Sequence, residues 1–547
     1  MEIPVRENKK TECVQKQTES ILLGAILLLA LSLRLAPLPD LTRGSLALEE
    51  GIAMTEASAL HWELVSSVQI DQGPLKSYLL HPLLYLSRDE FLLRLPSLFF
   101  DIFSILVLFF LGKALFDRKT ALLACFFMAV SVWHIHYATS ARNYPLYIFS
   151  LLGSALFLYR AVRSSGIRDW IFYAVALAFQ FYSFFWGFFF LIAQLGWFFI
   201  CYGRQGAQVK RLVLSLGLFL ILLLPSSGRL VNAFDYKTSQ APWDWGAQCL
   251  MIWELLGDHF GGVAGFLPLG IIVFVLSFVG LFYFRDKKRQ ALFLLMLVVV
   301  PILFYVFCQY VLRINIAPRY FLLTHPFFLL LSAAGILSWR RWTARAAGML
   351  VLLLPLFLYG LFQAKVIGKD LLPFDYLRQG EDHAAVASVI NEHEESLDFA
   401  VIEPPFALLS VQYYLDRTNR SPVIMLSKGP GKERCFIHRG PKVTLVGLEG
   451  DFETIKALAG AGRLLVVDFG QIAHEKNREE ILAWLEANSY RIERDYREHG
   501  EDLYFISPPK GGFAAGQGSS EAALHELFQE SRVVRYLTYP FNRHTGD

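Results

Sequence analysis

Residues 20–38 read SILLGAILLLALSLRLAPL, and residues 46–61 follow as LALEEGIAMTEASALH. The first segment is apolar over about the 20 residues that a helix needs to cross a bilayer. A secretory signal peptide would also begin in this way, but no small-x-small cleavage pattern follows the apolar run, which favours an uncleaved span. The second segment places two adjacent carboxylates, Glu49 and Glu50, in the first loop after that span. We therefore expect a membrane helix followed directly by an acidic loop.

The composition extends this prediction to most of the chain. Of the 547 residues, 54% are hydrophobic and only 18% are charged, whereas soluble proteins are roughly 25% charged. The net charge of +3 is too small to suggest a nucleic-acid partner. Length and hydropathy predict about eleven membrane spans, near residues 20–38, 91–115, 120–137, 144–159, 170–186, 188–202, 212–225, 263–284, 291–311, 320–338 and 346–362. The predicted fold class is a polytopic α-helical membrane protein.

The orientation follows from lysine and arginine in the short loops. Alternate loops are basic, at residues 113–119, 160–168, 204–211, 285–289 and 340–345. Cytoplasmic loops carry such an excess of basic residues, so we expect a multi-pass protein of the cell membrane with its N-terminus in the cytoplasm. An odd number of spans then places everything after residue 362 outside.

The C-terminal third of the chain changes character. Apolar runs shorten to strand length at residues 398–402, 443–446, 464–468 and 503–506, with helical patterns between them. Such alternation favours a small α/β domain with a mostly parallel sheet. The expected organisation is a transmembrane domain at 1–364 with a catalytic first outer loop at 39–90, an extracytoplasmic α/β domain at 365–508, and a linker with an amphipathic tail at 509–547. We expect that tail to form a helix over 521–535.

The acidic loop is the first place where chemistry is expected. If it is helical from residue 49, Glu49 shares a stripe with Glu56, while Glu50 aligns with Ala53 and Ala57. A carboxylate on a small apolar face is suited to act as a general base. The alternative is that the acids simply face water. Helical geometry favours Glu50 over Glu49 as the base, because only Glu50 lies on the small apolar face.

Three arginines are expected on the outer side, where basic residues are sparse. Arg142 lies between two predicted spans, and Arg313 and Arg319 precede another. A guanidinium group binds phosphate in a bidentate manner, so together they suggest a lipid-phosphate site. Singly, each could instead be an interfacial anchor. The aromatic run at residues 179–190 could line an isoprenoid chain, but we favour an interfacial aromatic belt.

Five short stretches, in order, resemble the GT-C glycosyltransferases, in the branch of the protein O-mannosyltransferases and the lipid A aminoarabinose transferases. They are LEEG at 48–51, QGPL at 72–75, LRLPS at 93–97, SARNYPL at 140–146 and PRYFL at 318–322. Two departures stand out: the family usually has Asp-Glu where this chain has Glu49-Glu50, and often has His-Pro-Pro where it has QGP. Both departures concern the identity of the substrate.

The resemblance implies a GT-C fold and transfer of a sugar from a polyprenyl-phosphate donor at the outer membrane face. The acceptor would be a hydroxyl of a lipid, glycan or protein, attacked with inversion. Glu49 or Glu50 would activate the acceptor, and Arg142, Arg319 and Arg313 would hold the donor phosphate. No cofactor is required, although a divalent cation at Glu49 and Glu50 could bridge to the phosphate.

Further candidates for contact with substrate are the remaining polar and aromatic residues on the outer side, namely Asp71, His61, His136, Tyr144 and Tyr320.

Two other classes of protein share the many spans. A transporter or flippase of a lipid-linked substrate would place ionisable residues inside its spans, and Asp101 is the clear case of one here. A structural or receptor subunit would use its outer domain to bind a partner. Convergence of the acids and arginines on one outer cavity would favour the enzyme.

Overall fold

The computed structural model describes residues 4–36, 50–51, 53–54, 57, 73–86, 89–164, 166–231, 275–281, 287–312, 320, 323–339, 341–363, 383–403, 407–415, 423–427, 434–439, 443–447, 455, 458–459, 462–468, 483–496, 502–507 and 532–536. The chain divides into two compact units. The first, which we call the membrane unit, comprises residues 1–39, 69–76 and 94–378. The second, the C-terminal unit, comprises residues 40–68, 77–93 and 379–547. The first outer loop therefore belongs largely with the C-terminal domain.

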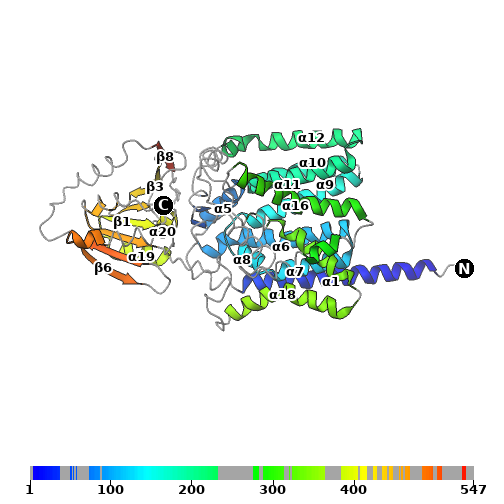
Figure 1. Cartoon of the computed structure of the whole chain (residues 1–547), viewed down its shortest axis with the longest axis horizontal. Helices are drawn as coiled ribbons and strands as arrows, with labels where there is room; N and C mark the ends of the chain where they lie inside the picture. The colour runs from blue at the N-terminus through cyan, green and yellow to red at the C-terminus, as the bar shows by residue number, and fades with distance from the viewer. Residues whose placement is uncertain are drawn as a thin grey trace, which may run out of the picture. The chain divides into compact units, whose positions relative to one another are not determined.

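The membrane unit is built from long apolar helices (Figure 1). Within the described residues, six helices are long and apolar enough to cross a membrane, or seven if one bent pair counts as a span. These features support a multi-pass membrane protein. The helices of this unit, including those too short to span, are α1 (Pro4–Leu35), α6 (Glu90–Leu115), α7 (Arg118–Val130), α8 (Val132–Ala138), α9 (Tyr144–Ser164), α10 (Ile167–Ser183), α11 (Phe188–Tyr202), α12 (Gly206–Leu223), α16 (Lys288–Tyr310), α17 (His325–Ser338) and α18 (Trp342–Gln363). Two 3₁₀ turns, η1 (Phe185–Gly187) and η2 (Leu224–Ser226), lie between them.

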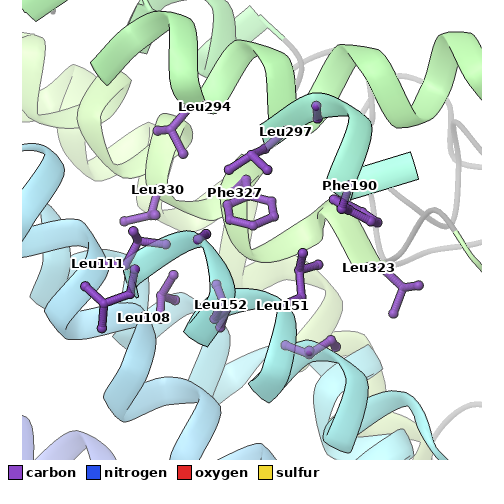
Figure 2. Close-up of a cluster of buried hydrophobic side chains, with 14 of the residues drawn as sticks. Leu108, Leu111, Leu151, Leu152, Phe190, Leu294, Leu297, Leu323, Phe327 and Leu330 are labelled. Atoms are coloured by element: carbon purple, nitrogen blue, oxygen red, sulfur yellow. The ribbon is translucent and has the colours of Figure 1, made fainter. Parts of the chain in front are cut away.

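The centre of the membrane unit is an apolar core around α17 (Figure 2). Phe327 and Leu330 of α17 lie among leucines of α6, α9 and α16 and Phe190 of α11. Residues 326–336 of α17 are all buried, as expected for a helix that is apolar on every side. A helix in such a position is surrounded by protein rather than by lipid.

The span predicted at residues 120–137 corresponds to two helices with a break between them, which the sequence did not indicate. α7 ends at Val130 and α8 begins at Val132, and the two axes differ by 61°. Ser131 between them is extended, with ψ of 120°. A break inside an apolar unit leaves the last carbonyls of α7 without intrahelical partners, and in a membrane each such group costs several kcal/mol unless it is satisfied.

A buried charge network satisfies that break. Arg34 of α1 donates from Nη1 to the carbonyl of Ala129 at 2.8 Å and from Nη2 to that of Met128 at 3.3 Å. Its Nε lies 2.6 Å from Asp101 Oδ2 of α6, and both side chains are almost completely buried. The other oxygen, Asp101 Oδ1, lies 3.1 Å from Nδ1 of His134 on α8. Arg34 thus caps α7, and Asp101 balances its charge while orienting the first turn of α8.

Basic residues gather at the opposite end of α6 and α7 from this break. Glu19 of α1 lies 2.8 Å from Lys113 Nζ and 3.0 Å from Arg118 Nη1. Lys287 donates to the carbonyl of Phe116 at 2.8 Å, which brings a second predicted inner loop to the same place. These contacts define a basic end of the membrane unit, and the loop between α8 and α9 lies at the opposite end.

The C-terminal unit contains an eight-stranded sheet, in the order β6-β7-β5-β1-β4-β3-β2-β8. The strands are β1 (Phe399–Glu403), β2 (Val423–Ser427), β3 (Arg434–Arg439), β4 (Thr444–Gly447), β5 (Leu464–Asp468), β6 (Arg491–Tyr496), β7 (Asp502–Ser507) and β8 (Arg532–Tyr536). The four strands expected from sequence are confirmed as β1, β4, β5 and β7. Two helices, α19 (His383–Glu392) and α20 (Ala407–Leu415), pack on the face of the sheet that carries Ala400 and Ile402 of β1.

Two expectations about this unit are wrong. The sheet is not mostly parallel: β1 is parallel to β4 and β5, whereas the other described pairings are antiparallel. Short connections such as residues 497–501 between β6 and β7 allow a hairpin but not the crossover that parallel strands need. The tail is not helical up to residue 535, because β8 pairs with β2 there, and Val533 and Val534 favour an extended backbone. The rest of the expected tail helix lies outside the described residues.

The Arg34–Asp101 pair makes a prediction about stability. The change Asp101→Asn should lower the stability of the folded protein by about 3–5 kcal/mol, because it leaves the buried Arg34 cation without its counter-ion. The double change Arg34→Met with Asp101→Leu should be more stable than Asp101→Asn, since no unpaired charge remains. The measurement is the thermal midpoint in detergent by size-exclusion chromatography.

Arg160→Gln is the control, because Arg160 is more than half exposed in its pair with Asp169 and such pairs contribute about 1 kcal/mol or less. An unchanged midpoint in Asp101→Asn would contradict the role given to the pair.

Candidate active site

The loop between α8 and α9 carries Arg142, the arginine that sequence singled out. α8 ends because Thr139 Oγ1 donates to the carbonyls of Ile135 and His136, at 3.1 and 2.9 Å, and Ser140 Oγ donates to that of His136 at 2.9 Å. The chain then turns, and Arg142 is 6% exposed. Its guanidinium carbon lies 5.7 Å from the ring centre of Tyr137, in a cation–π arrangement.

Three of the quoted sequence stretches hold this loop together. Ser97, the last residue of LRLPS, donates from Oγ to the carbonyl of Arg142 at 3.0 Å. Asn143 donates from Nδ2 to the carbonyl of Ser183 at 3.0 Å. The backbone N–H of Gly73, from QGPL, donates to the same Ser183 carbonyl at 3.3 Å. QGPL and SARNYPL therefore meet at the end of α10, and LRLPS binds the same loop at the Arg142 carbonyl.

Gly73 also explains one departure from the related motif. A Cβ at this position would overlap the backbone carbonyl of Tyr182 and lie 2.7 Å from the carbonyl oxygen of Phe181. A proline, which the related motif often has here, would in addition lack the N–H that reaches Ser183. The close approach of the two backbones requires glycine in this chain.

An aromatic cluster surrounds the loop. Tyr144 packs against Tyr137 with ring centres 4.5 Å apart and against Phe184 at 6.3 Å. Phe184 in turn lies 4.7 Å from Tyr320, so two of the candidate residues, Tyr144 and Tyr320, share one neighbour. Phe184, Phe185 and Trp186 are buried, which contradicts the expected interfacial belt for this part of residues 179–190. The run is interior because η1 turns it back between α10 and α11.

The acid of the first outer loop lies in the C-terminal unit. Glu50, Gly51, Ala53, Met54 and Ala57 are helical and buried, with Glu50 2% exposed. The predicted alignment of Glu50 with a small apolar face is therefore confirmed. α5 (Leu75–Leu86) supports this helix, because Nδ1 of His81 donates to the carbonyl of Ala57 at 2.6 Å.

The structure describes only some of the remaining candidate residues. Glu49, Asp71, His61, Arg313 and Arg319 lie outside the described residues. His136 is half-buried near the end of α8, with its ring centre 4.9 Å from that of Tyr137. In the described part of the chain, no three side chains of histidine, cysteine, aspartate or glutamate gather to bind a metal. Of the pair expected to bind a divalent cation, the structure describes Glu50.

The sequence analysis identified candidate catalytic groups, but it did not identify the residues that hold the loop of Arg142 in place. Asn143, Ser183 and Phe184 drew no prediction of a role at this site. Asn143 adjoins Arg142 in the sequence and could have been found from that position. The role of the Ser183 carbonyl as an acceptor could not be predicted from the sequence, because any residue type supplies a backbone carbonyl.

Comparison with known proteins finds a matching family model and solved structures of similar fold. A family model described as dolichyl-phosphate-mannose-protein mannosyltransferase matches residues 71–228, which include QGPL, LRLPS and SARNYPL. ArnT from Cupriavidus metallidurans in the apo state aligns with a TM-score of 0.57 and 12% identity over 90% of this chain and 98% of ArnT. The same protein bound to undecaprenyl phosphate aligns with a TM-score of 0.50 and 12% identity over 90% and 99%.

The archaeal oligosaccharyltransferase AglB from Archaeoglobus fulgidus, in complex with an inhibitory peptide and a dolichol-phosphate, has a TM-score of 0.51 and 12% identity over 91% of this chain and 75% of AglB. No curated protein sequence matches the chain. At these identities the structures establish the fold alone, which this chain shares with ArnT and AglB. The resemblance read from the ordered motifs is thereby confirmed.

The Gly73 contact leads to a prediction about the site. Gly73→Ala should destabilise the loop by about 1–3 kcal/mol, because the added methyl group meets backbone atoms that cannot rotate away. Gly196→Ala is the matched control: Gly196 lies in α11, where an added Cβ would meet nothing within 4 Å. Thermal midpoints of the two variants should therefore differ, and equal midpoints would show that the backbone contact of Gly73 with Tyr182 and Phe181 is not close.

Proposed function

We propose that the chain is an integral-membrane glycosyltransferase, which moves a sugar from a polyprenyl-phosphate donor to an acceptor hydroxyl at the outer membrane face, with inversion. The observation that carries the proposal is the placement of Arg142. This buried arginine lies at the end of the helices opposite the basic loops, and QGPL, LRLPS and SARNYPL are hydrogen-bonded around it. Solved structures of similar fold contain undecaprenyl phosphate and dolichol-phosphate, which supports the class of donor.

The leaving group explains the need for arginine. When the bond between the sugar carbon and the phosphate oxygen breaks, the polyprenyl phosphate leaves with added negative charge. A fixed cation at that oxygen stabilises the transition state more than the ground state. Ser97 binds the carbonyl of Arg142, and Asn143 anchors the next residue to Ser183, so the main chain that carries the guanidinium is positioned in advance. We assign Arg319 and Arg313 to the same phosphate on their sequence positions.

The acceptor needs a base. Its hydroxyl oxygen forms the new bond to the sugar carbon on the face opposite the phosphate, and its proton passes to a carboxylate. Glu50 suits this role because it is ionisable, almost fully buried and held on a helix. Glu49 occupies the position that the resemblance gives to the family's acid. A divalent cation between these carboxylates and the phosphate would supply further positive charge but is not required by this scheme.

The distribution of charge supports the sidedness. The ion pairs of Lys113 and Arg118 and the contact of Lys287 lie at one end of the membrane unit, and basic residues mark the cytoplasmic side. The loop with Arg142 lies at the other end of α8 and α9, so we assign it to the outer face, with the N-terminus cytoplasmic and about eleven spans in all.

A transporter was the alternative reading, and Asp101 was the residue that favoured it. Asp101 is paired with Arg34 and His134, and Arg34 is engaged with two carbonyls of α7. A charge committed in this way to the helix break is poorly suited to bind and release an ion. The glycosyltransferase therefore accounts for more of the observations.

Two variants test the division of roles. Arg142→Ala should weaken binding of undecaprenyl phosphate about 10- to 100-fold, the range for one charged hydrogen-bonding group. Glu50→Gln should leave that binding within about twofold yet lower sugar transfer by about 10² to 10⁴. Binding is measured by fluorescence titration in nanodiscs, and transfer with labelled undecaprenyl-phosphate mannose or glucose and a cell-envelope extract as acceptor.

Arg204→Ala serves as the control for Arg142→Ala, since Arg204 is exposed. Glu56→Gln serves as the control for Glu50→Gln, since Glu56 is predicted on a different stripe of the helix from Glu50. Glu49→Gln decides between the two neighbouring acids. Full transfer by Glu49→Gln, Glu50→Gln and Arg142→Ala alike would overturn the proposed site.

A further inference from the structure

The helix α20 of the C-terminal unit packs on the sheet and also contacts the helical residues of the first outer loop. These residues, which we call the loop helix, are Glu50, Gly51, Ala53, Met54 and Ala57. Leu408 and Val411 belong to the apolar cluster that includes Ala400 and Ile402 of β1. Ser410 and Tyr414, four residues apart, share a different face of the helix. That face contacts Gly51 and Glu90, which belong to the same compact unit.

The first contact involves the residue next to the proposed base. A Cβ at Gly51 would overlap Ser410 Oγ and lie 2.7 Å from Ser410 Cα and 2.8 Å from its Cβ. The backbone of the loop helix therefore packs directly on that of α20. Ser410 is completely buried, so the two backbones meet away from solvent, and Gly51 is the residue that permits this approach.

The second contact is a hydrogen bond one turn further along α20. Tyr414 Oη donates to Glu90 Oε1 at 2.9 Å. Glu90 begins α6, the span that also carries Ser97. α20 is thus attached both to the loop helix and to the start of the next membrane helix.

α5 contacts Ala57, another helical residue of the first loop. His81 donates to the carbonyl of Ala57, and Ala57 is completely buried. The loop helix is therefore held at Gly51 by α20 and at Ala57 by α5, with Glu50 beside the first of these contacts.

We propose that α20 positions the general base, with Ser410 and Tyr414 as positioning residues, so that the C-terminal domain is required for the chemical step itself. This inference rests on the proposed function, because it assumes that Glu50 accepts the proton. A catalytic group displaced by about 1 Å can lose about 10² in rate. Loss of the contacts that set the position of Gly51 should therefore lower kcat, whereas donor binding in the membrane unit should be unaffected.

The test combines three variants of the full-length protein in nanodiscs. Tyr414→Phe should lower kcat for transfer by about 10-fold or more and leave both the donor KM and undecaprenyl phosphate binding within about twofold. Gly51→Ala should do the same through steric overlap. Adding Ser410→Gly to Gly51→Ala should restore part of the lost kcat, because it removes two of the three overlapping atoms.

Hydrogen exchange gives a readout that does not depend on activity. Amides of residues 50–57 should exchange faster in Tyr414→Phe than in the unaltered protein, at an unchanged thermal midpoint. Tyr490→Phe is the control, because this half-buried tyrosine packs on Trp484 elsewhere in the same unit.

The outcomes separate the two proposals. If Glu50→Gln retains full transfer, the proposed base is wrong. If Glu50→Gln abolishes transfer while Tyr414→Phe and Gly51→Ala keep full kcat and normal exchange, the positioning role of α20 is overturned. A rise in donor KM without loss of kcat in Tyr414→Phe would also overturn it.

Discussion

The buried pair of Arg34 and Asp101 is the interaction on which the membrane unit depends. An apolar environment does not tolerate unsatisfied carbonyls, so the break between α7 and α8 requires a donor from elsewhere in the chain. Arg34 supplies it, and because a buried guanidinium needs a counter-ion, Asp101 must be present as well. Asp101 then contacts His134, in the first turn of the helix that leaves at 61°. That direction brings the following loop, with Arg142, to Ser97 and Ser183.

The same requirement shapes the site at a smaller scale. The α8–α9 loop is irregular and is held by the other quoted stretches and by α10. Ser97 donates to the Arg142 carbonyl, while Gly73 and Asn143 both donate to the carbonyl of Ser183. The short motifs therefore have a structural meaning apart from any contact with substrate. They are the parts of the chain that make an irregular loop stable beside a buried arginine, and this explains why weak motifs in the right order were informative together.

Sequence reasoning succeeded where a property depends on near neighbours. Hydropathy located α6 and α9 closely, and 3.6-residue periodicity placed Glu50 on the buried face with Ala53 and Ala57. It failed at the α7–α8 break, because Ser131 is flanked by neither proline nor glycine and the apolar run continues through it. It also assigned Phe184–Trp186 to a membrane interface, since composition cannot tell an aromatic side chain that faces lipid from one that faces other helices. The antiparallel pairings and β8 were missed because strand direction and edge pairing are set by partners far along the chain.

By itself, the sequence determined that this is a multi-span membrane protein with two acids in its first loop, four ordered motifs ahead of residue 150 and a strand-containing C-terminal region. Those properties follow from local hydropathy and residue order. Only the tertiary structure decided which carbonyls Arg34 caps, that Gly73 and Asn143 meet at Ser183, and that Gly51 packs on Ser410. The physical reason is that each of these contacts joins residues distant in sequence, and its geometry exists only once the helices that carry them have packed.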